Sequence, residues 1–306
     1  MTEFAVTPWS LGDNIVAGAL ADQAAVAESM GFHSFWLPEN HFGDQRSIPS
    51  PLTLLAAAAA KTSRIKLGTT SYLITIRHPL QAAEEVAVLD QLSEGRLILG
   101  LGRGVQPAMF KAFDLPTKEK RKRFQANLDV MLAAWAGEPV AMNDDQPVIL
   151  APLPHQRPHP ELWIAAFGPL ALKQAGRLGM PYLASPIETL TTLEANYTQF
   201  NQAVVEAERA PVKIVPVMRS IFISDKPTLI RDLKTAMDDG LPHAMRAENA
   251  SVDDWTIIGD SIYVRDRLAE YIEKLGVTHF VARGRFPVVS NEEQLDSHEQ
   301  LLALGL

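Results

Sequence analysis

Short apolar segments alternate along the chain with longer segments whose apolar residues recur at helical spacing. The short segments are rich in Val, Ile, Leu, Phe and Tyr, a composition typical of strands. Eight of them are predicted to be β-strands: Phe4–Thr7, Ser34–Leu37, Ile65–Tyr72, Leu97–Leu101, Leu162–Ala166, Tyr182–Ala184, Ile214–Ile223 and His279–Ala282.

The longer segments are predicted to be amphipathic helices. In Leu80–Leu92, apolar residues such as Val86 and Leu89 recur three to four positions apart, and Gly95 follows where a helix commonly ends. The other predicted helices are Gly18–Met30, Arg123–Trp135, Leu170–Leu178, Leu193–Glu208, Thr228–Asp238 and Ile262–Leu275.

This alternation predicts an α/β fold with a parallel sheet, because parallel neighbours need a crossover connection. The number of strands favours a (β/α)8 TIM barrel, with an open doubly wound sheet as the alternative. No linker or shift in composition divides the chain, so residues 1–306 are predicted to form a single domain. Two long segments, Gly137–Pro160 and Asp239–Ile258, are predicted to be insertion loops at the C-terminal face of the barrel.

Composition narrows the class of protein. The chain has 306 residues, 47% of them hydrophobic, which suits one α/β barrel of about 250 residues or more. The absence of cysteine excludes disulfides and thiol nucleophiles, and the net charge of −8 argues against a nucleic-acid partner. The N-terminus lacks the features of a signal peptide, and the apolar run Leu52–Ala60 is too short to span a membrane. We therefore expect a soluble, cytoplasmic protein with no membrane partner.

Candidate chemistry lies where predicted strands end, because the carboxyl ends of barrel strands carry the active site. Glu39, Asn40 and His41 follow the second strand, and a carboxylate beside an imidazole suits acid–base chemistry. The alternative is that Glu39 orients its neighbours as a buried acceptor and that His41 is a packing residue.

A second candidate feature is a phosphate site. The fifth predicted strand runs into Phe167–Ala171, which opens a helix whose unpaired N–H groups suit a phosphate. Gly168 allows close approach of a ligand, and Pro169 suits the first helical turn. Arg103 follows the fourth strand and is able to supply a bidentate contact to the same phosphate. Each feature alone also has a structural explanation, but together they favour a phosphate-bearing ligand.

Other motifs are absent or incomplete. No metal-ligand spacing such as His-Glu-x-x-His occurs, so no metal site is predicted. The segment Gly100–Gly104 lacks the third glycine of a dinucleotide fingerprint and continues into Pro107. The basic run Lys118–Arg123 is interpreted as a solvated helix face, with an anion contact as the alternative.

Taken together, several segments resemble the bacterial luciferase-like flavin monooxygenases. The resemblance extends over nearly the whole chain and is carried by Gly31–Phe42, Ile65–Thr69, Arg77–Leu80, Leu89–Leu97, Gly100–Gly104, Ala165–Ala171 and Ile258–Asp260. It implies a (β/α)8 barrel with reduced FMN lying across the C-terminal ends of the strands.

The resemblance also implies roles for individual residues. A cis peptide between Thr70 and Ser71 is expected to support the flavin ring, and Gly102 is expected to leave open space beside it. Arg103 matches the phosphate-binding arginine of the family, and the amides of Gly168–Ala171 match its phosphate cradle. The candidate cofactor-binding residues are Glu39, Thr69, Thr70, Ser71, Gly102, Arg103, Gly104, Val105, Phe167, Gly168, Pro169, Leu170 and Ala171.

The candidate catalytic residues, Asn40 and His41, depart from the luciferase pattern. Asn40 stands at the position of the luciferase catalytic histidine, His41 matches the histidine beside it, and Gly102 stands at the position of the active-site cysteine. Asn40 is able to hydrogen-bond but cannot act as a base near neutral pH. No light emission is therefore expected.

These inferences predict an FMN-dependent monooxygenase that uses reduced flavin and O2 on a small organic substrate. A separate NAD(P)H flavin reductase is the implied partner, and a homodimer through the helices that contain Ala56–Ala60 and Leu80–Leu92 is expected. The alternatives are hydride transfer with a deazaflavin coenzyme and a flavin-binding protein without catalysis. The segment Asp239–Ile258 is expected to be a lid over the substrate. Candidate apolar walls of the substrate site are Met237, Met245, Trp255 and Phe286.

Overall fold

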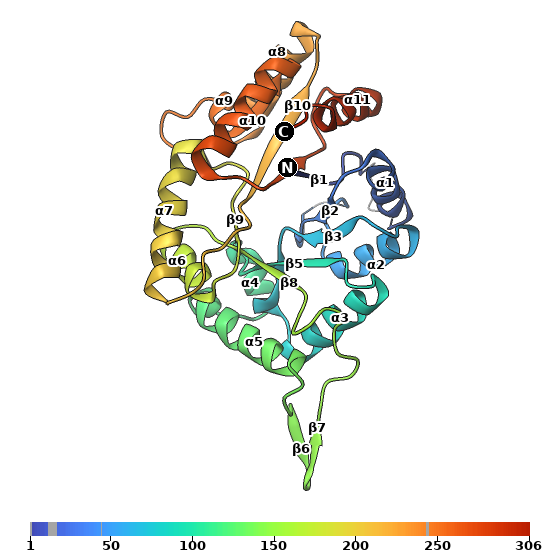
Figure 1. Cartoon of the computed structure of the whole chain (residues 1–306), viewed down its shortest axis with the longest axis vertical. Helices are drawn as coiled ribbons and strands as arrows, with labels where there is room; N and C mark the ends of the chain where they lie inside the picture. Colours follow the sequence, from blue (N-terminus) through green and yellow to red (C-terminus); the bar gives the residue numbers. More distant parts are fainter. Residues whose placement is uncertain (1, 12–16, 44, 243–244) are drawn as a thin grey trace. The chain divides into compact units, whose positions relative to one another are not determined.

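The computed structural model describes residues 2–11, 17–43, 45–242 and 245–306, through which strands and helices alternate (Figure 1). Contacts between Cα atoms divide the chain into two compact units. The first unit comprises Met1–Leu11, Val26–Trp36 and Ala166–Leu306, and the second comprises Gly12–Ala25 and Leu37–Ala165.

The first unit contains a parallel sheet in the order β11-β10-β12-β1-β2. Its strands are β1 (Glu3–Val6), β2 (Ser34–Leu37, whose last residue belongs to the second unit), β9 (Tyr182–Leu183), β10 (Pro216–Ile223), β11 (Thr256–Gly259) and β12 (His279–Arg283). Its helices are the end of α1 (Ala17–Met30), α6 (Pro169–Leu178), α7 (Leu190–Glu206), α8 (Pro227–Gly240), α9 (Val252–Trp255), α10 (Ser261–Leu275) and α11 (Asn291–Leu302). The register pairs Phe4 with Phe280, whose rings stack 6.0 Å apart, and Phe280 also meets Tyr271 of α10. This face of the sheet is therefore packed against the helical layer.

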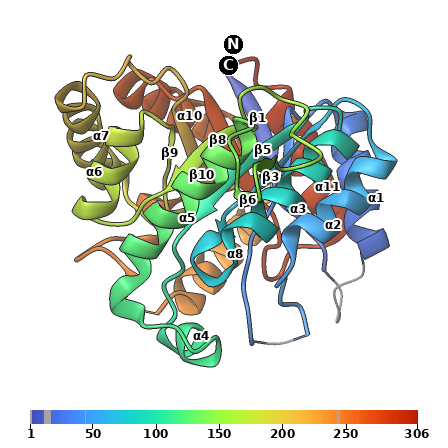
Figure 2. The ribbon, with the colours of Figure 1, turned by 90° about the horizontal axis from the view of Figure 1, so that it is seen from below.

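The second unit contains three parallel strands in the order β3-β5-β8, with β4 pairing with β5. Its strands are β3 (Lys66–Thr69), β4 (Tyr72–Leu73), β5 (Leu97–Gly102), β6 (Ala141–Asn143), β7 (Gln146–Val148) and β8 (Glu161–Ala165). Its helices, besides the start of α1, are α2 (Pro51–Lys61), η1 (Ile74–Ile76), α3 (Pro79–Leu92), α4 (Pro107–Ala112), η2 (Thr117–Glu119) and α5 (Lys120–Trp135). Helices α2 and α3 lie side by side, as Figure 2 shows. Strands β6 and β7 form an antiparallel hairpin that extends from the rest of this unit (Figure 1).

The segment Leu89–Leu97 owes much of its sequence to packing rather than to ligand binding. Arg96 donates hydrogen bonds to the carbonyl oxygens of Ala59 and Thr62, both at 3.1 Å, and so satisfies backbone acceptors at the end of α2. Asp90 is fully buried, and its carboxylate accepts hydrogen bonds from the backbone N–H and side-chain amide of Gln156 at 2.8 and 2.7 Å. These contacts connect α3 to α2 and to the segment before β8.

Sequence signals set the boundaries of several helices. Helix α6 begins with Pro169 after Gly168, whose φ of 81° favours glycine, and ends at the left-handed Gly179. Helix α11 begins with a capping box in which Ser290 and Glu293 satisfy each other's backbone N–H groups.

The predicted strands are confirmed, most of them within one or two residues at their ends. The run Ile65–Tyr72 is divided between β3 and β4, because the chain leaves the extended conformation at Thr70 and Ser71. The segment Asp239–Ile258 was wrongly predicted as a continuous loop, since its end forms α9 and most of β11; its residues 243–244 lie outside the described part.

The order of strands in the first unit departs from that of a simple barrel. Strand β10 lies between β11 and β12, so these two consecutive strands are not neighbours. In a simple (β/α)8 barrel each strand pairs with the next along the chain. Hydrophobic periodicity carries no information about which strands are adjacent, and the difference was therefore invisible in the sequence.

No helix within the described residues is both long enough and apolar enough to cross a membrane.

Candidate active site

The side chain of Glu39 is the centre of a buried polar cluster in the second unit. It is fully shielded from solvent and lies two residues after the end of β2. Its Oε1 lies 2.7 Å from Nε2 of His41 and accepts a hydrogen bond from Nη1 of Arg77 at 2.7 Å. Its Oε2 accepts a hydrogen bond from the backbone N–H of Leu73 at 2.9 Å. The carboxylate is therefore occupied by three protein donors, and it orients its neighbours as a buried acceptor.

Arg77 and Tyr72 extend this cluster towards α3. The guanidinium of Arg77 lies 4.1 Å from the centre of the Tyr72 ring and also donates to the Leu73 carbonyl at 2.9 Å. The Tyr72 hydroxyl donates to Oε2 of Glu85 at 3.0 Å. Burial raises the pKa of Tyr72 above its ordinary value, so the hydroxyl stays protonated and acts as a donor. The sequence pattern does not predict this role of Arg77, because its contact with Glu39 joins residues 38 positions apart and leaves no local pattern.

The two candidate catalytic residues lie in different surroundings. Asn40 is exposed, and its side-chain oxygen accepts a hydrogen bond from the backbone N–H of Ile48 at 2.9 Å, which ties the loop together. His41 is 8% exposed and has its Nε2 against Glu39, while the ring of Phe113 meets it edge-on at 5.3 Å. Only the Nδ1 side of His41 is then left for a ligand. Of the pair, His41 is held in one orientation and Asn40 has its amide N–H groups available.

The segment after β3 has the backbone geometry that the family resemblance implied. The peptide bond between Thr70 and Ser71 is cis. Thr69 is fully buried and donates its hydroxyl to the Gly100 carbonyl at 2.9 Å, so it holds β3 to β5. Thr70 and Ser71 are half-buried and are the members of this segment that a ligand could reach.

The expectation that Gly102 leaves open space is wrong. A Cβ atom at this position would lie 2.9 Å from Cβ of Ser71, and still closer to its Oγ, as well as 3.1 Å from Cδ2 of Leu73. The glycine is needed because β5 and the segment after β3 approach each other closely. The space beside it is filled by the Ser71 side chain.

Arg103 is a half-buried cation with unsatisfied donors. Its Nε and Nη2 atoms are buried without a hydrogen-bond partner in the described part of the chain. The guanidinium lies 5.4 Å from the centre of the Phe124 ring, and the Arg103 carbonyl accepts a hydrogen bond from the Thr75 hydroxyl at 2.8 Å. Burial, and then the nearby charge of Arg121, lower the pKa of Arg103. Because buried donors normally have partners, this arrangement fits an anionic ligand such as a phosphate.

Arg121 belongs to the basic run Lys118–Arg123, which had been interpreted as a solvated face. The structure begins α5 at Lys120 and brings the charge of Arg121 close enough to act on Arg103. An anion contact by this run, the alternative to a solvated face, stays a prediction.

The residues after Arg103 turn the chain into α4. Gly104 has φ of 75°, and a Cβ atom there would lie 2.6 Å from Cε of Met109, so a larger residue is disfavoured. Val105 is 70% exposed.

The first unit contains the other predicted phosphate-binding segment, Phe167–Ala171. Phe167 and Leu170 are exposed at 69% and 65%, whereas Ala171 is buried. Pro169 has no N–H group, and the Ala171 amide donates to the Gly168 carbonyl at 3.0 Å. Neither position therefore offers a free N–H, and the predicted cradle has fewer donors than expected.

The predicted apolar walls do not form one surface. Met237 and Phe286 belong to a core cluster with Phe222, Leu233 and Ile258 in the first unit. Trp255 is buried at 3% exposure, and Met245 is 56% exposed. Core packing, rather than a substrate site, accounts for Met237 and Phe286.

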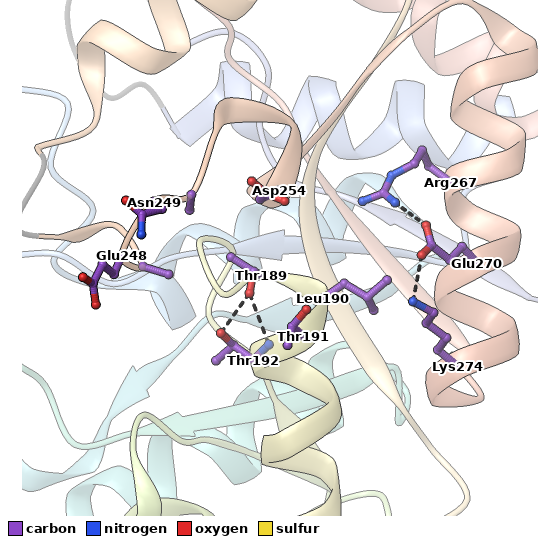
Figure 3. A pocket seen from close by; sticks show the side chains of 12 residues that line it. Thr189, Leu190, Thr191, Thr192, Glu248, Asn249, Asp254, Arg267, Glu270 and Lys274 are labelled. Carbon is purple, nitrogen blue, oxygen red and sulfur yellow. Dashed lines mark hydrogen bonds and ion pairs between the residues drawn. The ribbon is translucent and has the colours of Figure 1, made fainter.

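A polar pocket of about 470 Å³ lies within the first unit (Figure 3). It is lined by the start of α7 at Thr189, by residues 247–250 and by one side of α10. On α10, Lys274 Nζ lies 2.9 Å from Oε1 of Glu270, and Arg267 bonds to the other oxygen of the same carboxylate. The hydrogen bond from Lys274 lowers the pKa of Glu270. Both cations that line this pocket from α10 are already paired with the Glu270 carboxylate, which makes the pocket a weak candidate for the substrate site.

Comparison with known proteins identifies the family. The family model for luciferase-like monooxygenases matches residues 1–233, and the chain belongs to this family. Limonene 1,2-monooxygenase of Rhodococcus erythropolis is 30% identical over 185 residues, which cover 58% of this chain and 48% of that protein. F420-dependent glucose-6-phosphate dehydrogenase of Kineococcus radiotolerans is 33% identical over 183 residues, which cover 56% of this chain and 54% of that protein.

A solved structure matches almost the whole chain. It is the oxygenating constituent of 3,6-diketocamphane monooxygenase from the CAM plasmid of Pseudomonas putida, in complex with FMN. The TM-score is 0.79 at 20% identity, with 98% of this chain and 96% of that chain covered. The predicted α/β fold class, of the TIM-barrel type found in luciferase-like proteins, is thereby confirmed. The chain spans about half the length of the curated relatives it matches.

Proposed function

We propose that the protein is an FMN-dependent monooxygenase that acts on a small organic substrate. The observation that carries this proposal is the half-buried guanidinium of Arg103, directly after β5, whose Nε and Nη2 atoms are buried without a hydrogen-bond partner among the described residues. A phosphate monoester would satisfy its free donors and neutralise its charge beside that of Arg121. Membership of the luciferase-like family and the likeness to a structure that holds FMN support the choice of this cofactor.

Reduced FMN, when bound, supplies the two electrons with which one atom of O2 enters the substrate and the other leaves as water. The residues of the chain supply binding, orientation and proton handling. Arg103 and Arg121 bind the phosphate. Thr70, Ser71, Gly104 and Val105 are the accessible neighbours that we assign to the cofactor.

His41 is the group that we assign to proton transfer at the substrate. Its Nε2 is held by Glu39, so its Nδ1 is the atom that takes or gives a proton. Asn40 donates a hydrogen bond from its side-chain amide but does not exchange protons. Glu39 is a positioning residue, because its oxygens already accept from His41, Arg77 and Leu73.

The phosphate assignment is tested by titrating the wild-type protein and Arg103→Ala with FMN, following the quenching of flavin fluorescence. Loss of one charge-assisted bidentate contact is expected to weaken binding by at least about tenfold. Arg157→Ala, which removes a guanidinium from the segment before β8, is the control and should bind FMN as the wild type does. Equal affinity of Arg103→Ala and wild type for FMN contradicts the assignment.

The reaction is tested by measuring oxygen consumption with enzymatically reduced FMN and a set of aldehydes, ketones and aromatic compounds. An oxygenated product formed in proportion to the substrate consumed supports the proposal. Reoxidation of FMN without any oxygenated product contradicts it.

Hydride transfer with a deazaflavin is the second candidate function. It is favoured by the 33% identity to a relative named as an F420-dependent dehydrogenase. Titration with F420 in parallel with FMN distinguishes the two, because preferential binding of F420 reverses the order of the proposals.

We also propose a separate NAD(P)H flavin reductase as partner, since the matched structure is named as the oxygenating constituent of a larger enzyme. A homodimer through α2 and α3 is proposed because these helices lie side by side and because Val88 and Leu92 of α3 are 52% and 50% exposed, since exposed apolar side chains favour association.

A further inference from the structure

Arg283 is the last residue of β12, at the carboxyl end of the parallel sheet in the first unit. Side chains alternate between the two faces of a strand. Phe280 lies on the face that meets Tyr271 of α10, and Ala282 shares this face because it is two positions further along. Arg283 therefore lies on the opposite face, away from the helix. In folds of this class, the carboxyl ends of parallel strands are where ligands bind.

The guanidinium of Arg283 has no partner among the residues that the structure describes. Within the described part of the chain it makes neither an ion pair nor a side-chain hydrogen bond, although the residue is half-buried. Its register partner on β10 is Ser220, which is neutral. The charge that acts on it is that of Arg285, which has the same sign. Burial, and then Arg285, lower the pKa of Arg283. A half-buried cation that faces a like charge is stabilised by an anion that neutralises it.

The backbone beside Arg283 is held firmly. Gly284 donates its N–H to the Thr7 hydroxyl at 3.0 Å, and a Cβ atom on Gly284 would lie 2.8 Å from Cβ of Trp9 and 3.0 Å from the Pro8 carbonyl. The Thr7 N–H in turn donates to the Ala282 carbonyl at 3.0 Å. The end of β12 is thus closely packed against the segment that follows β1. A guanidinium carried by such a rigid strand end is preorganised to bind a ligand.

We propose that Arg283 binds an oxyanion, a carboxylate or a phosphate, carried by the organic substrate. The planar guanidinium suits two parallel hydrogen bonds to either group. Within the described part of the chain neither Arg283 nor Arg285 has an ion-pair partner, although the whole chain carries a net charge of −8. The identification of the anion as a substrate group rests on the proposed function, whereas anion binding itself does not.

The experiment measures binding by the full chain without flavin, using isothermal titration calorimetry at low ionic strength. The probes are benzoate, phenyl phosphate and the neutral benzamide. The wild type is expected to bind at least one of the two anions and to bind it more tightly than benzamide. Arg283→Met is expected to weaken that binding by at least tenfold. Arg265→Met removes an exposed arginine that pairs with Asp266 on α10, and it should leave binding unchanged.

Two further measurements separate the possible outcomes. Arg283→Lys keeps the charge but loses the bidentate geometry, so it is expected to bind benzoate more weakly than the wild type while retaining part of the affinity for phenyl phosphate. It also serves as the test variant if Arg283→Met does not fold. FMN titration of each Arg283 variant should give the wild-type affinity.

The proposal is overturned if neither anion binds the wild type, or if the Arg283 variants bind it unchanged. It is also overturned if these variants lose FMN binding, because Arg283 would then belong to the cofactor site. If only the proposed oxygenation fails, the probes still bind in a way that depends on Arg283, but no oxygenated product forms. This result is distinct from a failure of anion binding.

Discussion

Replacing Glu39 with glutamine keeps the shape of the side chain and removes its charge. The carboxylate is fully buried and accepts three hydrogen bonds, two through Oε1 at 2.7 Å and one through Oε2 at 2.9 Å. A glutamine amide has only one acceptor oxygen, so its NH2 group must face either the Leu73 N–H or the donors of His41 and Arg77. At least one buried donor then loses its partner, and the positive charge of Arg77 is no longer neutralised.

The magnitude follows from these contacts. A hydrogen bond to a charged group contributes about 1.5–3 kcal/mol, and removing one partner of a buried ion pair costs about 3–5 kcal/mol. The Arg77 side chain is 18% exposed and is able to recover part of its hydration, which places the effect at the lower end. We expect Glu39→Gln to lower the free energy of unfolding by about 3 kcal/mol.

The assay is urea unfolding followed by tryptophan fluorescence, with wild type and variant compared at one pH and salt concentration. Glu84→Gln is the matched control, since Glu84 is exposed on α3 and undergoes the same chemical change. It is expected to stay within about 0.5 kcal/mol of the wild type. Arg77→Met, alone and combined with Glu39→Gln, completes a double-mutant cycle. The double variant should lose less stability than the sum of the losses of the two single variants. A loss below about 1 kcal/mol for Glu39→Gln, or fully additive losses in the cycle, refutes the role given to this carboxylate.

Three further predictions concern packing, acid stability and association. Gly102→Ala forces Ser71 to move and is expected to lower the free energy of unfolding by about 1–3 kcal/mol and to weaken FMN binding. The control Gly18→Ala, in open space on α1, should be neutral or slightly stabilising. Unchanged stability of Gly102→Ala in urea unfolding contradicts the close approach of Ser71 to Gly102. Burial between Trp9 and Phe32 lowers the pKa of His298 to about 4, so the stability that neutral His298 contributes is complete above the unfolded pKa of about 6.5 and is lost as the pH falls through 4. Between pH 7 and pH 4, the free energy of unfolding of His298→Gln should therefore fall by roughly 3 kcal/mol less than that of the wild type. Equal losses for the two proteins in urea unfolding rule this out. Val88→Asp with Leu92→Asp is expected to halve the molar mass measured by light scattering, and a monomeric wild type at micromolar concentration refutes the dimer through α3.

The sequence carried the information for the strands and helices and for the type of fold. Alternating apolar runs located nearly every strand, because strand and helix periodicity depends on neighbouring residues alone. Strand β11 was missed because most of it lies within Asp239–Ile258, which was predicted to be a loop, and because it follows α9 without a turn signal. Local patterns likewise placed Arg103 and His41 after strand ends, where the structure has them, whereas the cis peptide at Thr70–Ser71 was expected only from the family resemblance.

Tertiary structure decided what these residues contact. Whether Gly102 faces open space or the Ser71 side chain depends on how closely β5 approaches the segment after β3, and nothing near Gly102 in the sequence encodes that approach. The role of Glu39 depends on Arg77, which lies 38 residues away. Whether Arg103 and Arg283 are available to a ligand depends on whether a carboxylate from another segment lies within pairing distance of them. Periodicity and turn chemistry act over a few residues, whereas burial and ion pairing depend on contacts between distant segments. For this reason the sequence alone predicted the elements and the family, and only the folded chain showed which cations are left without partners.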